Sequence, residues 1–265
     1  MKKKIQYLLV ICVLWISSSK AQQTEIYTEA DRDYKKGYEL FVKEKYGAAQ
    51  DVLDRFIKEN KGSSHNLINA AYYSAVSSYE LFNPDAEQKL VNFTLKYPES
   101  TKTPLAWFYL GRHYYRTKRF PKALPAFEKA DVYYLTGDEV AEYYFKTGYC
   151  YFSKNDNEKA AKSFHEILGV ESKYQTAAQY YYGHIAYSSN NYKTAMEYFR
   201  KLDSSATFGP LVPYYITQMY YEQSKFDEVT KYGTNILQNG NPQNASEITG
   251  LLLSRITAKV ITKTH

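Results

Sequence analysis

The sequence predicts an all-α fold, an α-solenoid in which about six helical hairpins stack in a row, followed by a terminal helix. Apolar residues recur at spacings of three and four, which is the period of a helix and not of a strand. Small residues also recur at a fixed interval, because Ala49, Ala86, Ala123 and Ala160 are each 37 residues apart and Ala195 follows after 35. A constant period of this length indicates a repeat architecture. Repeats explain how 265 residues fold without one large globular core.

The clearest hairpin spans residues 103–130, and each of its two helices carries one apolar face. The two faces comprise Trp107, Leu110, Gly111 and Tyr114 on the first helix, and Phe120, Ala123, Phe127 and Ala130 on the second. Gly111 and Ala123 are small and stand among large residues, which predicts that the two helices approach closely there.

The same register predicts the other hairpins along the chain. The expected organisation is a signal peptide at 1–21, a linker at 22–30, and a solenoid domain at 31–265 with repeats at 31–62, 67–99, 104–133, 140–170, 176–204 and 210–238, and a partial repeat or cap at 244–263. The second hairpin has Ser74 at the glycine position, and Pro98 ends its second helix. The sixth has Val229 at the alanine position and Gly233 where phenylalanine is expected. The terminal helix is interpreted either as a cap or as the start of a longer array.

The pattern W-x2-L-G-x2-Y followed by A-x3-F-x2-A in residues 107–130 resembles the tetratricopeptide repeat. This resemblance implies a right-handed superhelix of hairpins that acts as a binding scaffold. The linker residues Tyr97, Pro98, Ser100, Pro104 and Ala106 also resemble the repeats of two bacterial envelope proteins, the Bam-type assembly lipoprotein and the Tol-associated cell-division coordinator. The chain departs from the Bam-type protein because no lipid-acceptor cysteine follows the expected cleavage region.

The first 21 residues have the features of a secretory signal peptide. Residues 2–4 are lysines, residues 5–16 form a short apolar stretch, and Ser19 and Ala21 are small residues at the positions that a signal peptidase reads. The alternative is an uncleaved anchor helix. We therefore expect an exported protein of the periplasm or outer-membrane periphery of a Gram-negative bacterium, with no transmembrane segment after cleavage.

Signal cleavage changes the charge and the cysteine content of the chain. It removes four lysines and no acidic residue, so the formal charge falls from +6 to +2. This small charge disfavours nucleic acid as a partner. Only Cys150 then remains, so no internal disulfide is expected and a buried structural thiol is the favoured interpretation.

No enzyme or cofactor site is apparent in the sequence. The five histidines, His65, His113, His165, His184 and His265, form no metal-ligand spacing with cysteine or with one another, and His165 is expected to be solvated. There is no glycine-rich phosphate loop and no nucleophile elbow. The sequence therefore predicts a protein without a metal, a cofactor or an enzymatic activity.

The chain contains 30 tyrosines and 13 phenylalanines, more than the repeat core requires. The resemblance implies that the first helix of each hairpin lines a concave face, with the residues three before, one after and four after the glycine position directed into a groove. These candidate partner-binding residues are Tyr34, Tyr38, Phe41, Phe108, Arg112, Tyr115, Phe145, Tyr149, Phe152, Tyr180, His184, Tyr187, Tyr214, Gln218 and Tyr221. Arg116 joins Arg112 as a basic pair that could bind a carboxylate. The second hairpin supplies only Ala71, Ala75 and Ser78, which leaves a gap.

Two interpretations of these rings remain open at the level of sequence. In one, the rings pack between neighbouring first helices and fill the superhelix. In the other, they bind an extended peptide, since tyrosine offers both area and hydrogen bonds. The expected function is a non-enzymatic, exported scaffold that binds a protein or peptide segment of an envelope complex. The alternative is a glycan- or solute-binding helical-repeat module resembling the starch-binding lipoproteins, although the chain lacks their anchoring cysteine and large inserted domain.

Overall fold

The structure is a computed structural model that describes residues 30–263, with side-chain surroundings described for residues 32–254. The predicted signal peptide lies outside the described residues. The described part consists of thirteen α-helices and one short 3-10 helix, and it contains no strand. This confirms the all-α prediction and the expected stacking of helical hairpins.

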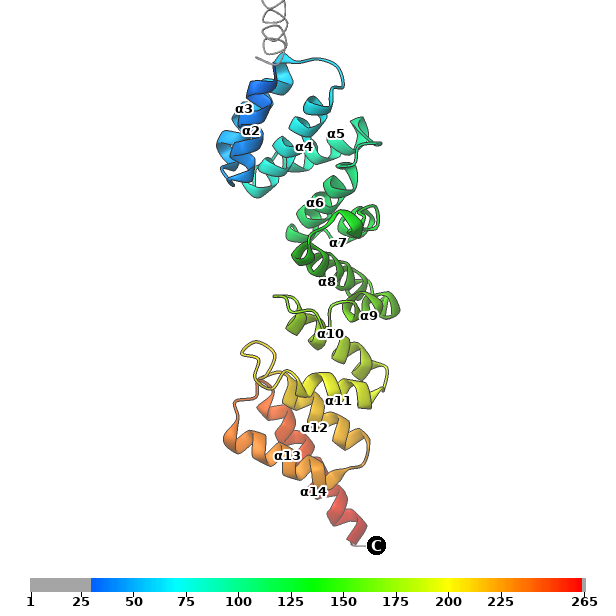
Figure 1. Cartoon of the computed structure of the whole chain (residues 1–265). Coiled ribbons are helices and arrows are strands. Elements are labelled where there is room, and N and C mark those ends of the chain that lie inside the picture. The colour runs from blue at the N-terminus through cyan, green and yellow to red at the C-terminus, as the bar shows by residue number, and fades with distance from the viewer. Residues whose placement is uncertain (1–29, 264–265) are drawn as a thin grey trace, which may run out of the picture. The chain divides into compact units, whose positions relative to one another are not determined.

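The helices form two compact units that divide between Tyr134 and Leu135, whereas the sequence analysis treated 31–265 as one domain (Figure 1). The first unit holds α2 (Ala30–Val42), α3 (Tyr46–Glu59), α4 (His65–Glu80), α5 (Ala86–Lys96), α6 (Thr103–Arg116), α7 (Phe120–Glu128) and η1 (Val132–Tyr134). The second unit holds α8 (Gly137–Ser153), α9 (Asn157–His165), α10 (Gln175–Ser188), α11 (Tyr192–Arg200), α12 (Val212–Glu222), α13 (Phe226–Asn239) and α14 (Ala245–Lys263).

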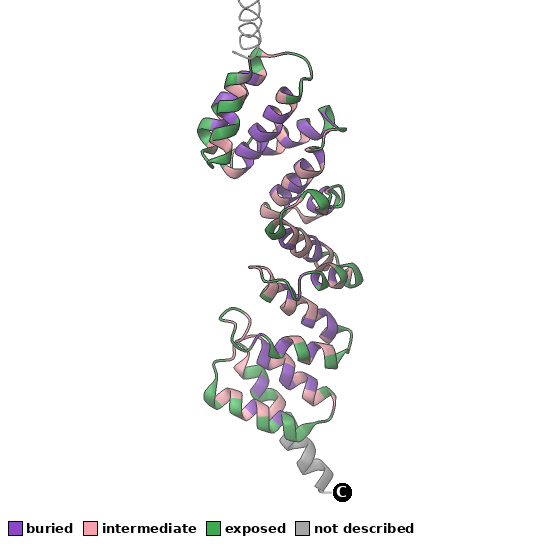
Figure 2. Ribbon diagram, viewed as in Figure 1, coloured by how far each residue is buried: buried purple, intermediate pink, exposed green. Residues whose placement is uncertain are grey.

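Consecutive helices pack in pairs, and within each unit the second helix of one hairpin packs on the first helix of the next. The repeating small position lies at the centre of each hairpin. Its residues are all fully buried: Ala49, Ala86, Ala123, Ala160, Ala195 and, in the sixth hairpin, Val229. Figure 2 shows that the buried residues lie where helices face one another. The alanine register of the sequence therefore identifies the hairpin core correctly.

Each hairpin turn contains one residue in the left-handed region of the backbone. These residues are Glu44, Phe82, Lys118, Asn155, Asn190 and Ser224. In the first hairpin the amide of Lys45, directly after Glu44, donates to the carbonyl of Leu40 at 2.9 Å. This bond closes the helix in the manner of a Schellman motif, which usually contains glycine at the left-handed position. None of the six is glycine, so the sequence does not reveal these turns.

Several helix starts are stabilised by side chains that satisfy free backbone amides. Thr136 and Glu139 form a capping box at the start of α8, with Glu139 accepting from the amide of Thr136 at 3.0 Å. Ser64 caps α4, Asp156 caps α9 and Asn191 caps α11 through their side-chain oxygens. These caps help to fix where each first or second helix begins and hence which residues face the next hairpin.

The glycine position allows the two helices of a hairpin to approach closely. A Cβ atom at Gly111 would lie 2.6 Å from ring atoms of Phe127, and one at Gly148 would lie 2.8 Å from Phe164. The second hairpin instead has Ser74, which is buried and donates a hydrogen bond to the carboxylate of Asp54 on α3. A polar bond to the preceding hairpin thus replaces the close approach of a glycine.

Candidate functional site

The first helices of the second unit carry a continuous group of half-buried rings, which we call the aromatic surface. It comprises Phe145, Tyr149 and Phe152 on α8, Tyr180, Tyr181, His184 and Tyr187 on α10, and Tyr214 and Tyr215 on α12. Seven of these nine residues are the sequence-predicted candidates of the fourth to sixth hairpins. Tyr181 and Tyr215 were not predicted, and they are the residues that join one helix to the next.

Tyr181 connects α10 to α8. Its ring centroid lies 5.3 Å from that of Tyr149 and 5.2 Å from that of Phe152. It also stacks on the fully buried Phe164 at 5.6 Å. These separations are in the range of favourable aromatic pairs. Tyr181 therefore ties the aromatic surface to the core of the preceding hairpin.

Tyr215 makes the equivalent connection from α12 to α10. Its ring centroid lies 5.2 Å from Tyr187, 5.5 Å from His184 and 5.3 Å from the buried Phe199. Burial and the neighbouring Tyr215 together raise the pKa of Tyr180. The rings of the three first helices consequently contact one another in an unbroken series. These contacts are of the kind expected if the rings pack between neighbouring first helices.

The aromatic surface carries hydroxyl groups that remain protonated at neutral pH. Burial, helped by the neighbouring tyrosines, raises the pKa of both Tyr181 and Tyr187 to about 12. Burial also lowers the pKa of His184, and no hydrogen-bond partner of its buried Nδ1 atom is found in the described part of the chain. The surface is thus neutral near pH 7, and it can offer apolar ring area together with hydrogen-bond donors.

The candidate residues of the first hairpin contact the ring of Tyr73 in the second hairpin, where the sequence predicts a gap in the series of aromatic residues. Tyr38 and Phe41 lie 5.0 Å and 4.7 Å from the ring of Tyr73, and Tyr34 lies 6.3 Å from Tyr38. Tyr73 directly precedes Ser74, a position that the sequence analysis did not consider. The gap expected from Ala71 and its equivalents is therefore closed by a residue at a different register position.

The basic pair on α6 is occupied within the chain. Arg116 donates from Nη1 and Nη2 to the carbonyl oxygen of Tyr79, at 3.2 Å each, and its guanidinium lies 4.1 Å from the rings of Tyr79 and Phe82. Arg112 forms an ion pair with Glu80 at 3.5 Å. The expectation that this pair awaits the carboxylate of a partner is corrected, because α4 already supplies acceptors to both side chains.

Phe108 also differs from its prediction. Its side chain is fully buried and packs against Phe127, with ring centroids 6.2 Å apart, beneath the guanidinium of Arg112. A ring in this position belongs to the core and offers no surface to a partner. The ring packs against the second helix of its own hairpin, which the spacing within the first helix alone does not predict.

The candidates four residues after the glycine position close their own hairpin turns. Four such pairs join the end of the first helix to the first residue of the second: Phe41 with Tyr46 at 5.7 Å, Tyr115 with Phe120 at 5.4 Å, Tyr187 with Tyr192 at 6.2 Å, and Tyr221 with Phe226 at 5.8 Å. Tyr115 and Tyr221 therefore have a local structural role. Gln218 pairs with Glu222 on the same helix at 2.7 Å.

Apart from Tyr73, the residues that sequence reasoning missed share one register position. Tyr109, Tyr181 and Tyr215 each stand two residues before the glycine position of their hairpin, and each contacts rings of the preceding first helix. This regularity is visible in the sequence once the register is known. In these three hairpins the residue at that position contacts the preceding hairpin through its ring.

The cysteine and the exposed histidine of the second unit stand outside the aromatic surface. Cys150 is a buried free cysteine, as predicted, and burial raises the pKa of its thiol to about 12. His165 is exposed, as predicted. In residues 32–254 no three His, Cys, Asp or Glu side chains gather in a way that could hold a metal ion. Nor does any helix in the described part have the length and hydropathy required to cross a membrane.

The stacked hairpins, their buried small positions and their aromatic contacts define a helical-repeat protein. Residues 104–130 and residues 151–210 match models of the tetratricopeptide repeat. The chain therefore contains tetratricopeptide repeats, as its sequence predicts. No curated protein matches the chain.

Three solved structures are similar in fold. PilF from Pseudomonas aeruginosa is 14% identical, with a TM-score of 0.52 over 85% of this chain and 97% of the other. A tetratricopeptide repeat protein from Parabacteroides merdae is 12% identical, with a TM-score of 0.51 over 87% of each chain. MamA from Desulfovibrio magneticus is 17% identical, with a TM-score of 0.51 over 65% of this chain and 92% of the other. At these identities the likeness concerns the fold alone.

Proposed function

We propose that this chain is an exported, non-enzymatic protein–protein interaction scaffold of the bacterial cell envelope, and that a partner segment binds to the aromatic surface. The observation that carries this proposal is the half-burial of nine rings on three successive first helices. Tetratricopeptide repeats form extended surfaces of this kind, which suit the binding of polypeptide partners.

The degree of burial distinguishes these rings from the core of the same hairpins. Phe164 and Phe199 are fully buried, whereas every member of the aromatic surface retains accessible area. Phe164 is fully covered because Tyr181 of the next hairpin stacks on it, and rings that served packing alone could be covered in the same way. The remaining exposed area is therefore available to a partner, and tyrosine gives such contact at little cost in conformational entropy.

The chemistry of the surface favours an extended segment with apolar and neutral polar side chains. Tyr181 and Tyr187 keep their protons because burial raises the pKa of each to about 12. Their hydroxyls can thus donate to the backbone carbonyls of a bound segment, while the ring faces contact its side chains. The surface itself contains no acidic or basic residue other than His184, so charge contributes little to recognition.

The proposed location rests on the first 21 residues. A basic start, a short apolar stretch and a small-residue cleavage motif together favour export. The linker around Tyr97 and Pro98, with its resemblance to Bam-type and Tol-associated envelope proteins, supports the periplasm or the outer-membrane periphery as the destination. Fractionation of cells that express the full chain tests this, and cytoplasmic retention would contradict it.

Capture from envelope extract tests the binding surface. Immobilised residues 22–265 are compared with a surface variant, Tyr149→Ala, Tyr187→Ala and Tyr214→Ala, at equal helix content by circular dichroism. The matched control removes Tyr182 and Tyr198, which pack together at 5.0 Å outside the aromatic surface of the same unit. A photoreactive phenylalanine analogue at position 214 identifies the bound segment by crosslinking.

The expected result is a partner that binds the parent and the control, is lost from the surface variant, and crosslinks at position 214 through an apolar, extended segment. Retention of the same partner by the folded surface variant would show that the rings only pack. Specific elution by a free oligosaccharide, with no protein crosslinked, would favour the glycan-binding alternative instead.

A further inference from the structure

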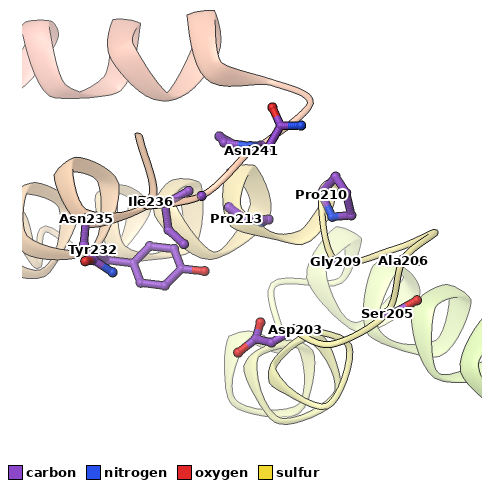
Figure 3. Close-up of a pocket in the computed structure, with 12 residues that line it drawn as sticks. Asp203, Ser205, Ala206, Gly209, Pro210, Pro213, Tyr232, Asn235, Ile236 and Asn241 are labelled. Atoms are coloured by element: carbon purple, nitrogen blue, oxygen red, sulfur yellow. The ribbon is translucent and has the colours of Figure 1, made fainter. Parts of the chain in front are cut away.

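The second unit contains a cavity that lies apart from the aromatic surface. It has a volume of about 500 Å³ and lies between the loop that follows α11 and the end of α13 with its following loop (Figure 3). Its lining includes Asp203, Pro210 and Pro213 together with Tyr232 of α13. None of its lining residues belongs to the aromatic surface, so its role is independent of the function proposed above.

One negative charge stands in this cavity. Asp203 is the only charged residue among the side chains that the structure describes around it. Figure 3 shows the Asp203 carboxylate and the Tyr232 hydroxyl on different walls of the same cavity. Burial, together with the charge of Asp203, raises the pKa of Tyr232, so its hydroxyl remains a donor. The Tyr232 ring is half-buried and adds a π-face to the wall.

The charge of Asp203 is not balanced by an ion pair within the described residues. The nearby Arg200 directs its Nη2 atom to the hydroxyl of Tyr220 at 2.9 Å instead. Asp203 remains exposed to solvent, but its surroundings remove part of the water from the carboxyl and raise its pKa, an effect that the charge of Arg200 partly offsets. A carboxylate in this state is stabilised when a cation enters beside it.

The walls of the cavity are held in place by the backbone. The amide of Gln243 donates to the carbonyl of Pro210 at 2.8 Å and so links the two loops. Gly209 is required where the loop turns back on itself, because a Cβ atom there would lie 2.5 Å from the carbonyl oxygen of Ser205. A site formed before its ligand arrives loses little entropy on binding.

We infer that this cavity binds the cationic group of a basic side chain, the guanidinium of arginine or the ammonium of lysine, with Asp203 as its counter-ion and the Tyr232 ring as a cation–π wall. An Asp carboxylate offers the geometry that a guanidinium recognises, and an aromatic face attracts the same cation. The absence of any basic residue from the described lining leaves room for one to be supplied by the ligand.

The test uses residues 22–265 and three small probes followed by NMR titration: Nα-acetyl-arginine amide, Nα-acetyl-lysine amide and the neutral arginine analogue Nα-acetyl-citrulline amide. Single side chains bind weakly, so we expect a Kd of about 1 mM for the cations. Asp203→Asn should weaken binding at least tenfold. Glu228→Gln, which removes an exposed acid elsewhere on α13, is the matched control and should bind as the parent does.

A second variant, at Tyr232, separates a loss of cation binding from a loss of folding. Tyr232→Phe retains the ring and should retain most of the affinity, and its spectrum reports whether the loop remains folded. The inference is overturned if citrulline amide binds as tightly as arginine amide, if Asp203→Asn binds like the parent, or if neither cation shifts resonances of the cavity at tens of millimolar. Loss of partner capture by the aromatic variant leaves this outcome unaffected.

Discussion

The third to fifth hairpins and the sixth place their small and large residues on opposite helices. In the regular hairpins the first helix carries glycine and the second carries phenylalanine, as with Gly111 and Phe127. In the sixth hairpin the first helix carries the fully buried Thr217 and the second carries Gly233. The larger residue of the pair therefore stands on the first helix and the small one on the second, the reverse of the regular hairpins.

The exchange has a consequence for the neighbouring helix. A Cβ atom at Gly233 would lie 3.4 Å from side-chain atoms of Ile248 and Leu252 on α14. Ile248 is fully buried, and α14 packs against both α12 and α13. The volume that phenylalanine fills within a regular hairpin is thus supplied in the sixth by the following helix. In both kinds of hairpin the space beside the glycine is filled by an apolar side chain, either from the second helix or from the following helix.

The largest expected effect is the loss of a core ring from a regular hairpin. Phe164→Ala removes a fully buried ring that contacts Gly148 and Tyr181. We expect the free energy of unfolding of the second unit to fall by about 3–5 kcal/mol, because a cavity replaces the ring. Urea denaturation of residues 22–265 followed by circular dichroism measures this change.

The counterpart in the sixth hairpin is Ile248→Ala, and it tests whether α14 replaces the missing phenylalanine. A loss of about 2–4 kcal/mol is expected, since the side chain is fully buried. Leu253→Ala is the control, because Leu253 is exposed on the same helix. If Ile248→Ala behaves like Leu253→Ala, the comparison between the hairpins fails.

Adding one methyl group should separate the two glycines. Gly111→Ala places Cβ 2.6 Å from the ring of Phe127, and overpacking of about 1–3 kcal/mol exceeds the helix propensity gained, which is at most about 1 kcal/mol. Gly233→Ala meets its neighbours at 3.4 Å and should be neutral or stabilise by up to about 1 kcal/mol. Thermal unfolding should therefore show a lower midpoint for Gly111→Ala and an unchanged or higher midpoint for Gly233→Ala, and equal destabilisation would contradict the exchange of size.

The position after the glycine site also differs between the hairpins, with His184 in the fifth and Gln218 in the sixth. Burial lowers the pKa of His184, so the folded chain holds it neutral while the unfolded chain takes up a proton near pH 6.5. The free energy of unfolding is then greatest above that pH and decreases as the pH falls.

His184→Gln should make this decrease smaller, and the measurement is the unfolding midpoint between neutral and mildly acidic pH. His113 in the first unit contributes in the same direction, because burial also lowers its pKa, so part of the decrease remains. The control is His165→Gln, which removes an exposed histidine from the same unit. An unchanged curve for His184→Gln would contradict the assignment.

The smallest expected effect concerns the hairpin turns. Ser224 adopts a φ of 56° in the sixth hairpin, where Asn155 and Asn190 stand in the fourth and fifth. Ser224→Asn should stabilise the second unit by about 0.5 kcal/mol, because asparagine tolerates the left-handed region better. Ser224→Val, a β-branched residue in the same conformation, should shift the unfolding midpoint in the opposite direction, and a gain in both variants would exclude the turn as the cause.

Much of the fold follows from local patterns that the sequence displays directly. Apolar spacing predicts the helices, and the alanine register from Ala49 to Ala195 predicts the hairpin core, because both depend on residues close together in the chain. The resemblance to the tetratricopeptide repeat, applied to that register, places seven of the nine residues of the aromatic surface on the first helices. It fails for Phe108, which is fully buried against Phe127, and for Tyr181 and Tyr215, whose partners lie on the preceding first helix.

The sequence by itself therefore determined the class of fold, the period of the repeat, the buried Cys150 and the abundance of tyrosine on first helices. The tertiary structure decided which rings stay half exposed, which arginines are already paired, how α14 compensates for Gly233, and where the Asp203 cavity lies. The physical reason is the range of the interactions. Helix formation and hairpin pairing are set within about 37 residues, whereas exposure, ion pairing and cavity shape depend on which surfaces the adjoining hairpins present.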